Sequence, residues 1–185
     1  AYDNMRIISG FAGGRRLAAP NNNQIRPTID RVKESLFSIL GDLEGVHVVD
    51  GFAGTGSLGC EALSRGAASC AFFDASREAI ELVKENVAIV GAEDRALIKK
   101  CPFKRGLTLL QHEPDLILLD PPYGDAPLVD RSFEAMLSCD KITAGALVVL
   151  EQEIDDDLPE APGFEKEDER EYARTRITFW RREEG

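Results

Sequence analysis

The chain has 185 residues, a length typical of a single domain that buries a full mixed core. Its four cysteines, Cys60, Cys70, Cys101 and Cys139, are scattered without a Cys-x-x-Cys pair or a histidine cluster, which argues against a zinc site and a redox motif. No apolar stretch approaches the roughly 20 residues of a membrane-spanning helix. The scattered cysteines indicate a reduced, cytoplasmic domain without a metal. The net charge of the chain is −11.

The first 44 residues form a unit of their own ahead of the main pattern. Ile7 and Ile8 predict a short strand, the glycines at 10, 13 and 14 break it, and apolar residues at helical spacing predict a helix that ends near Leu40. Thr28 is a candidate cap for this helix. We expect residues 1–44 to be a strand-helix extension of one domain, 1–185, whose core spans 45–185.

From residue 46 onward, short apolar runs alternate with segments of helical period, the pattern of a parallel sheet covered by helices. Strands are predicted at 46–49, 70–73, 96–98, 116–119 and 146–150, and helices from 58, over 80–90 and at 128–137. Residues 164–172 and 176–180 predict an antiparallel hairpin at one edge. The expected fold is α/β, with a mostly parallel seven-stranded sheet and helices on both faces.

The negative charge is concentrated in residues 151–171, where eleven Asp and Glu oppose only Lys166 and Arg170. Basic residues cluster elsewhere, around Arg15 and Arg31, at 99–105, and from Arg174 to the end. Such runs are most often solvated faces, and each is also a candidate for phosphate binding. The net acidity therefore does not exclude a nucleic-acid partner.

The first predicted core strand runs into a glycine-rich loop, in which Gly54, Gly56 and Gly59 satisfy Gly-x-Gly-x-x-Gly, with Asp74 closing the next strand. That pattern alone fits a nicotinamide dinucleotide, whose pyrophosphate sits on the backbone of such a loop. Asp50 at the strand end is awkward beside a pyrophosphate and useful beside a cation or an amino group. S-adenosylmethionine meets that requirement, because it carries an ammonium and a sulfonium and no phosphate.

A second motif, here called the DPPY motif, follows the apolar run 116–119 and consists of Asp120, Pro121, Pro122 and Tyr123. Proline pairs mark turns, so a plain turn after a strand is one interpretation. A carboxylate, a carbonyl held by fixed proline φ angles and an aromatic ring together suit chemistry on a planar nitrogen. Asp120 and the Pro121 carbonyl would accept the two amino hydrogens while Tyr123 stacks on the base.

With both motifs in place, the sequence resembles the RsmD family, methyltransferases of the Rossmann-like class I fold that act on a guanine exocyclic amine of 16S ribosomal RNA. The resemblance extends to Arg26-Pro27-Thr28, to residues 30–37 and 61–67, and to Thr175-Arg176. It implies S-adenosylmethionine as cofactor, small-subunit ribosomal RNA within the small subunit as substrate, and a monomer that binds no membrane.

The resemblance and the loop together give a candidate residue set. Cofactor contacts are expected from Asp50, Phe52, Ala53, Gly54, Thr55, Gly56, Asp74, Ala75 and Cys101, and RNA contacts from Arg15, Arg26, Thr28 and Arg31. The family commonly has an acidic or amide residue near Cys101 to hold the adenine amine. This chain has Lys99-Lys100-Cys101-Pro102 there, so backbone groups and apolar contact are expected to bind the adenine.

Three rival functions are consistent with parts of the pattern. A nicotinamide-dependent oxidoreductase leaves the DPPY motif and Asp50 without a role. A methyltransferase acting on adenine of DNA or on a protein glutamine uses the same motif, because those groups also present planar nitrogens. A non-catalytic RNA-binding module accounts for the basic clusters alone.

Overall fold

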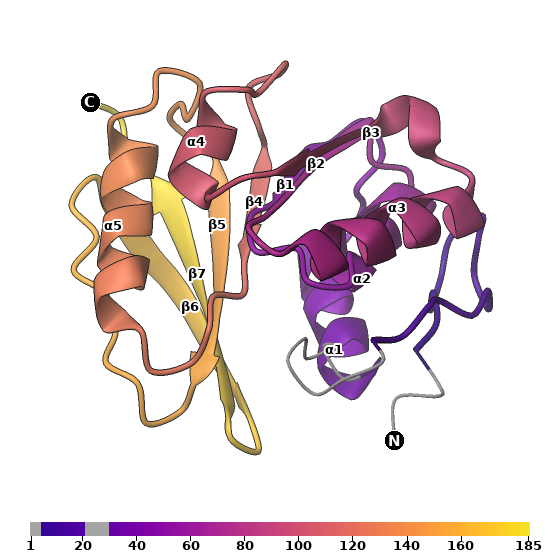
Figure 1. The fold of residues 1–185 in the computed structure, drawn as a ribbon. Coiled ribbons are helices and arrows are strands. Elements are labelled where there is room, and N and C mark those ends of the chain that lie inside the picture. Colours follow the sequence, from indigo (N-terminus) through magenta and orange to yellow (C-terminus); the bar gives the residue numbers. More distant parts are fainter. Residues whose placement is uncertain (1–4, 21–29) are drawn as a thin grey trace.

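The computed structural model describes residues 5–20 and 30–185 as a seven-stranded sheet between two layers of helices (Figure 1). The strand order is β3-β2-β1-β4-β5-β7-β6, and β1 to β5 are parallel while β7 pairs antiparallel with β5 and β6. The strands are β1 (His47–Asp50), β2 (Ser69–Asp74), β3 (Ala96–Lys100), β4 (Leu116–Leu119), β5 (Leu147–Glu153), β6 (Phe164–Tyr172) and β7 (Thr175–Arg182). The expected α/β fold with a C-terminal antiparallel hairpin is confirmed.

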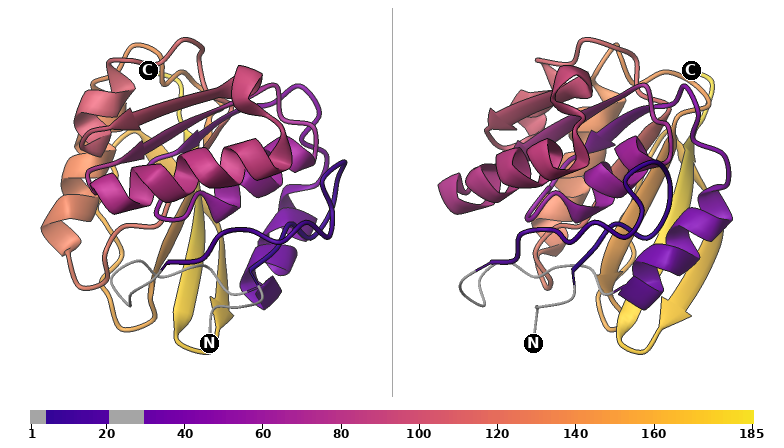
Figure 2. Two further views of the ribbon diagram at one scale, coloured as in Figure 1. Left: turned by 45° about the vertical axis from the view of Figure 1, so that its right-hand side comes forward. Right: turned by 90° about the vertical axis from the view of Figure 1, so that its right-hand side faces the viewer.

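In the part of the chain that the structure describes, five α-helices cover the two faces of the sheet: α1 (Asp30–Leu40), α2 (Ser57–Ser64), α3 (Arg77–Val90), α4 (Phe103–Leu107) and α5 (Ala126–Leu137). Helices α1, α2 and α3 share one apolar core with the sheet, and α4 and α5 share the other (Figures 1 and 2). Successive side chains of each buried strand lie on opposite faces of the sheet, so Val48 and Val49 of β1 pack in different cores. None of the helices in the described ranges has the length and hydropathy of a membrane-spanning segment.

The N-terminal unit differs from the expectation. Instead of a strand at Ile7 and Ile8, the described segment contains one isolated antiparallel bridge, between Arg6 and Arg16. The chain doubles back at once because Gly10 and Gly14 take φ angles of 88° and 87°, which let a tight turn form. Thr28, the predicted helix cap, lies outside the described residues.

Two short helical segments were missed by the sequence pattern. A 3₁₀ turn, η1 (Glu93–Arg95), and the five-residue α4 are too short to show a helical period. The bounds of the longer elements agree with the prediction to within a few residues.

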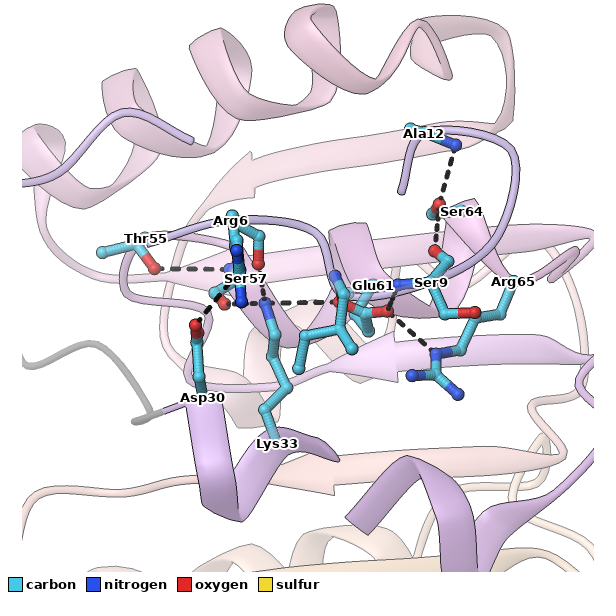
Figure 3. Close-up of polar contacts among 12 residues, drawn as sticks. Arg6, Ser9, Ala12, Asp30, Lys33, Thr55, Ser57, Glu61, Ser64 and Arg65 are labelled. Carbon is cyan, nitrogen blue, oxygen red and sulfur yellow. Dashed lines mark hydrogen bonds and ion pairs between the residues drawn. The ribbon is translucent and has the colours of Figure 1, made fainter. Parts of the chain in front are cut away.

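A buried carboxylate attaches the N-terminal unit to the core. Glu61 of α2 is fully buried and accepts hydrogen bonds from the backbone N–H groups of Ile8 (2.8 Å) and Ser9 (3.1 Å) (Figure 3). It also forms ion pairs with Lys33 of α1 (3.3 Å) and Arg65 (2.8 Å). One side chain therefore joins α1, α2 and the N-terminal segment.

Lys33 is the buried partner of this group. Its Nζ donates to the Arg6 carbonyl at 2.7 Å and to Ser57 Oγ at 3.0 Å, in addition to its ion pair with Glu61. Burial lowers the pKa of Lys33, and the Glu61 carboxylate opposes that shift by stabilising the charged form. Since Ser57 begins α2 directly after the glycine-rich loop, this contact sets α1 beside that loop.

Two further polar side chains extend the attachment. Ser64 Oγ donates to the Ser9 carbonyl at 2.7 Å and accepts from the Ala12 N–H at 3.0 Å. Asn86 of α3 bonds both backbone groups of Ala18 and donates to the Thr55 carbonyl at 2.8 Å. The segment thus follows α2 and α3 back toward the glycine-rich loop.

Replacement of Glu61 by alanine is expected to lower the free energy of unfolding by about 3 to 5 kcal/mol, because Lys33 would keep a buried charge without its partner. Urea unfolding measures the effect. Glu85→Ala on the exposed face of α3 is the matched control and should stay within about 0.5 kcal/mol of the parent. Equal losses in the two variants would contradict the role given to Glu61.

Candidate active site

Four carboxyl side chains gather at one edge of the sheet. Asp50 and Asp74 end β1 and β2, and Asp120 directly follows β4. Glu151 lies inside β5, directly after the Leu119–Leu150 register pair, and the register pairs Asp50 with Phe72 and Leu118. Because neighbouring parallel strands end together, residues far apart in sequence meet there. This edge is where open α/β sheets bind their ligands.

The glycine-rich loop between β1 and α2 is built for close backbone approach. Gly54 and Gly56 have φ angles of 56° and 80°, which favour glycine. A Cβ on Gly51 would stand 2.7 Å from the Phe103 ring, so this position also requires glycine. Two backbone hydrogen bonds attach the loop to the sheet. The Gly51 N–H donates to the Leu118 carbonyl and the Ala53 N–H to the Phe73 carbonyl, both at 2.9 Å.

Asp50 supports this loop from inside. Its side chain is buried and its Oδ2 accepts the Gly59 N–H, in the first turn of α2, at 3.0 Å. Burial raises the pKa of Asp50 to about 7, with the negative charge of Asp74 acting in the same direction and the Gly59 hydrogen bond opposing it. The expected contact between Asp50 and a ligand cation stays a prediction.

Asp74 faces the outer side of the same loop. Its Oδ2 accepts the Gly54 N–H at 2.9 Å and its Oδ1 accepts the Ser76 N–H at 2.8 Å, while the side chain stays half-buried. Each carboxylate oxygen retains a second lone pair for a ligand donor. Ala75 is exposed beside it, and the Cys101 N–H donates to the Asp74 carbonyl at 2.9 Å.

The remaining loop residues have different environments. Phe52 is half-buried and stacks on Phe103, with ring centroids 5.7 Å apart, which gives the pocket edge an apolar wall. Thr55 is buried, and its hydroxyl accepts the Ser57 N–H at 3.3 Å. The structure therefore brings Phe52, Gly54, Asp74 and Cys101 to one partly open surface and places Thr55 beneath it.

The DPPY motif leaves the sheet at the end of β4. Asp120 is half-buried, Pro121 is buried, and Pro122 and Tyr123 are exposed, with 38% of Tyr123 accessible. The following Gly124 has a φ of 75°, and its N–H donates to Asp156 Oδ2 at 3.4 Å. Asp125 then caps α5 by accepting the Leu128 N–H at 3.1 Å.

Glu151 is the residue of this edge that sequence reasoning missed. It is 9% exposed, follows the Leu119–Leu150 register pair, and forms a side-chain hydrogen bond with Asp120. Burial raises the pKa of Glu151 to about 7 and that of Asp120 well above its usual value, and the charges of Glu151 and Asp50 add to the Asp120 shift. The sequence signal was the same as for Asp120, an acid directly after an apolar run, but the surrounding acidic segment masked it.

Two of the four residues predicted to contact RNA, Arg15 and Arg31, lie within the described ranges, and their surroundings differ. Arg15 donates to the Ile89 and Val90 carbonyls at the C-terminus of α3, at the far end of that helix from Asp74. Arg31 is exposed in the first turn of α1, which starts beside the glycine-rich loop. Arg26 and Thr28 lie outside the described residues.

The acidic segment is partly neutralised by the C-terminal arginines. Arg174 bonds Glu153 and Asp155, both at 2.8 Å, and Arg181 pairs with Glu167 at 3.0 Å. These two arginines are thus already paired with acidic partners of the same sheet edge.

A surface depression lies at the opposite edge of the sheet, near the start of β1, β2 and β3. The rings of His47 and His112 stack there at 4.1 Å, and His47 Nδ1 bonds Ser69 Oγ at 2.7 Å. This edge contains none of the four gathered carboxyls, so we assign it no ligand. No group of metal-binding side chains occurs within residues 5–20 and 30–185.

Known proteins resemble this chain over nearly its whole length. A family model described as conserved hypothetical protein 95 matches residues 5–181. YlbH of Bacillus subtilis is 36% identical over 167 residues, which are 86% of this chain and 88% of YlbH. Ribosomal RNA small subunit methyltransferase D of Haemophilus influenzae is 33% identical over 163 residues, 85% of this chain and 83% of that protein.

Solved structures show the same architecture. The protein yhhF of Escherichia coli superposes with a TM-score of 0.84 at 27% identity, covering 98% of this chain and 99% of yhhF. An RNA methyltransferase from Salinibacter ruber, solved in complex with S-adenosyl-L-homocysteine, superposes with a TM-score of 0.66 at 14% identity, covering 86% and 95%. The second likeness is one of fold alone.

We expect the unliganded protein to lose stability as the pH rises from about 5.5 to 7.5. The folded state raises the pKa of Asp50 from 3.8 and of Glu151 from 4.5 to about 7. It therefore holds protons in this window that the unfolded chain has released, and the stabilisation disappears as the pH passes the folded pKa. Glu167 and Asp168 have lowered pKa values in the folded state, so they change the free energy of unfolding only at pH values below this window.

Urea unfolding at several pH values tests this trend, and Asp50→Asn should make it shallower. Glu165→Gln, at an exposed position of β6, is the matched control and should leave the slope unchanged. A free energy of unfolding that is flat or rises over the window would contradict the assignment.

Proposed function

The chain belongs to the RsmD family, that of the conserved hypothetical protein 95 model, and on this premise we propose that it methylates the exocyclic N2 of a guanine in small-subunit ribosomal RNA with S-adenosylmethionine. The observation that carries the proposal is the DPPY motif at the end of β4, in the same sheet edge as Asp74 and the glycine-rich loop. A methyl donor and a planar amine would thus be bound at one edge.

The residues of the loop fit S-adenosylmethionine. Asp74 keeps lone pairs for the two ribose hydroxyls, Gly54 and Gly56 permit close approach of the backbone, and Phe52 offers an apolar wall. The half-buried Cys101 lies next to Asp74, where the adenine would be held by backbone and apolar contact. When bound, the cofactor supplies an electrophilic methyl group on a sulfonium.

Asp120 and Pro121 would prepare the nucleophile. The N2 lone pair of guanine is delocalised into the ring, so the amine attacks poorly unless acceptors hold its hydrogens. The Asp120 carboxylate accepts one N–H, and the Pro121 carbonyl, held by fixed proline φ angles, accepts the other. Both acceptors aim the nitrogen at the methyl carbon, and such positioning supplies much of the rate.

Tyr123 would hold the base. Its ring is partly exposed at the mouth of a small pocket formed with Pro121, Pro122 and Glu151. Stacking of an unpaired base on such a ring is worth about 1 to 3 kcal/mol. The guanine must therefore be unstacked from its neighbours in the RNA.

The rivals differ in what they explain. A nicotinamide enzyme accounts for the loop but gives no role to the DPPY motif. Methylation of DNA adenine or of a protein glutamine fits the motif, and the small-subunit RNA name of the Haemophilus influenzae relative favours RNA. A non-catalytic binding module would give no role to the half-buried Asp120 beside Glu151. We further propose that the enzyme is a cytoplasmic monomer whose substrate is the assembled small subunit.

Incubation with labelled S-adenosylmethionine and small subunits lacking the modification should give label in N2-methylguanosine after nuclease digestion. Asp120→Asn is expected to lower the rate about 100-fold or more while binding of the subunit and the cofactor persists, because an amide accepts the amine proton poorly. Asp130→Asn in α5 is the charge-matched control. Label in N6-methyladenosine would refute the guanine assignment, and full activity of Asp120→Asn would refute its role.

S-adenosylhomocysteine should raise the melting temperature of the protein, and a nicotinamide dinucleotide should not. Asp74→Ala is expected to weaken S-adenosylhomocysteine binding at least tenfold, because the ribose loses its acceptor and the Gly54 N–H loses its partner. Glu78→Ala in the next helix is the control, and isothermal titration measures both. A dinucleotide shift without a homocysteine shift would support the oxidoreductase instead.

A further inference from the structure

Asp120, just after β4, and Glu151, inside the adjacent strand β5, form a pair of carboxyl groups. Leu119 of β4 pairs with Leu150 of β5, so the next residues, Asp120 and Glu151, stand opposite each other. Their side chains form a hydrogen bond with each other. Two carboxylates cannot share a hydrogen bond unless one of them carries a proton.

The surroundings of the pair are short of positive charge. No cation of the described chain makes an ion pair with either carboxyl. Arg176 on the neighbouring strand uses its guanidinium on Gln152 Oε1 (3.3 Å) and on the Ile154 and Asp156 carbonyls. Asp50 adds a negative charge from β1. Two full charges side by side would therefore repel without compensation.

The other polar groups near the pair have assigned contacts. Asp156 Oδ2 accepts the N–H groups of Gly124 (3.4 Å) and Glu153 (3.3 Å), so its carboxylate fastens the DPPY loop to the end of β5. Tyr123 lines the same small pocket as Glu151. Glu151 thus lies next to Asp120 in register and next to Tyr123 in the small pocket.

We propose that Glu151 is a positioning residue that shares one proton with Asp120, keeping one oxygen of Asp120 fixed and leaving the other free to accept the guanine amine. This rests on the proposed function. The shared proton lies between one oxygen of each carboxyl, and the second Asp120 oxygen faces the substrate. The pair thus carries one negative charge instead of two.

This arrangement also gives the reaction proton a destination. As the N2–methyl bond forms, the sulfur–methyl bond breaks and its electron pair stays on sulfur, which becomes a neutral thioether. The methylated nitrogen then loses a proton to the free oxygen of Asp120. The pair becomes neutral, with one proton on each carboxyl, and returns to its single charge by releasing a proton to water.

The test is the pH dependence of the single-turnover rate with small subunits and saturating S-adenosylmethionine. The parent should show an acidic limb near pH 7, since methylation needs the singly charged pair. Glu151→Gln keeps the shape and a hydrogen-bond donor but removes the shared proton. Its acidic limb should move down by about one pH unit or more, and its plateau should fall about tenfold because Asp120 becomes less basic.

Glu153→Gln, two residues along the same strand, is the control and should keep the parent profile, because Glu153 pairs only with the exposed Arg174. The thermal shift by S-adenosylhomocysteine should be unchanged in both variants. A Glu151→Gln profile that superposes on the parent, or a loss confined to cofactor binding, overturns the inference. If the parent itself forms no N2-methylguanosine, the proposed function fails instead.

Carboxyl ¹³C titration keeps the inference testable if Glu151→Gln does not fold. The unliganded parent should show two coupled steps for Asp120 and Glu151, with the later one at or above pH 7. Asp120→Asn should remove the coupling and leave Glu151 with a single step. Two independent titrations below pH 5 in the parent would overturn the shared proton.

Discussion

The buried ion pair between Lys33 and Glu61 is the contact on which the arrangement of the site depends. It joins α1, α2 and the N-terminal segment without access to water, and Lys33 also bonds Ser57, where the glycine-rich loop enters α2. A buried pair is costly to desolvate and costly to break, so it favours one arrangement of these elements over others. The position of α1 beside the loop follows from it.

At the sheet edge proposed as the active site, acidic side chains hold the loops in place. Asp50 fixes the loop from within, Asp74 fixes it from outside, and Asp156 fastens the DPPY loop to the end of β5. Each accepts backbone N–H groups, which hold the loops without blocking the ligand surface. Burial raises the pKa values of Asp50, Asp120 and Glu151, and neighbouring negative charges add to the shifts of Asp50 and Asp120, which couples the site to pH near neutrality.

The acidic segment has two roles according to position. In its first part, Glu151 and Asp156 lie beside the DPPY motif, while Glu153 and Asp155 pair with Arg174. Its later part forms the exposed face of β6, an edge strand on which alternating charges discourage pairing with another sheet. Most of the net charge of −11 therefore comes from this segment, at one edge of the sheet.

The sequence by itself determined the positions of the strands along the chain, the hairpin, the glycine-rich loop and the DPPY motif, because hydrophobic period and turn residues are local signals. Only the tertiary structure decided what pairs across strands. It placed Glu151 against Asp120, put Asp50 beneath α2, and used Arg15 on the C-terminus of α3. The five-residue α4 and the three-residue η1 also lacked a readable period. Contacts between distant segments depend on register and burial, which no local pattern encodes.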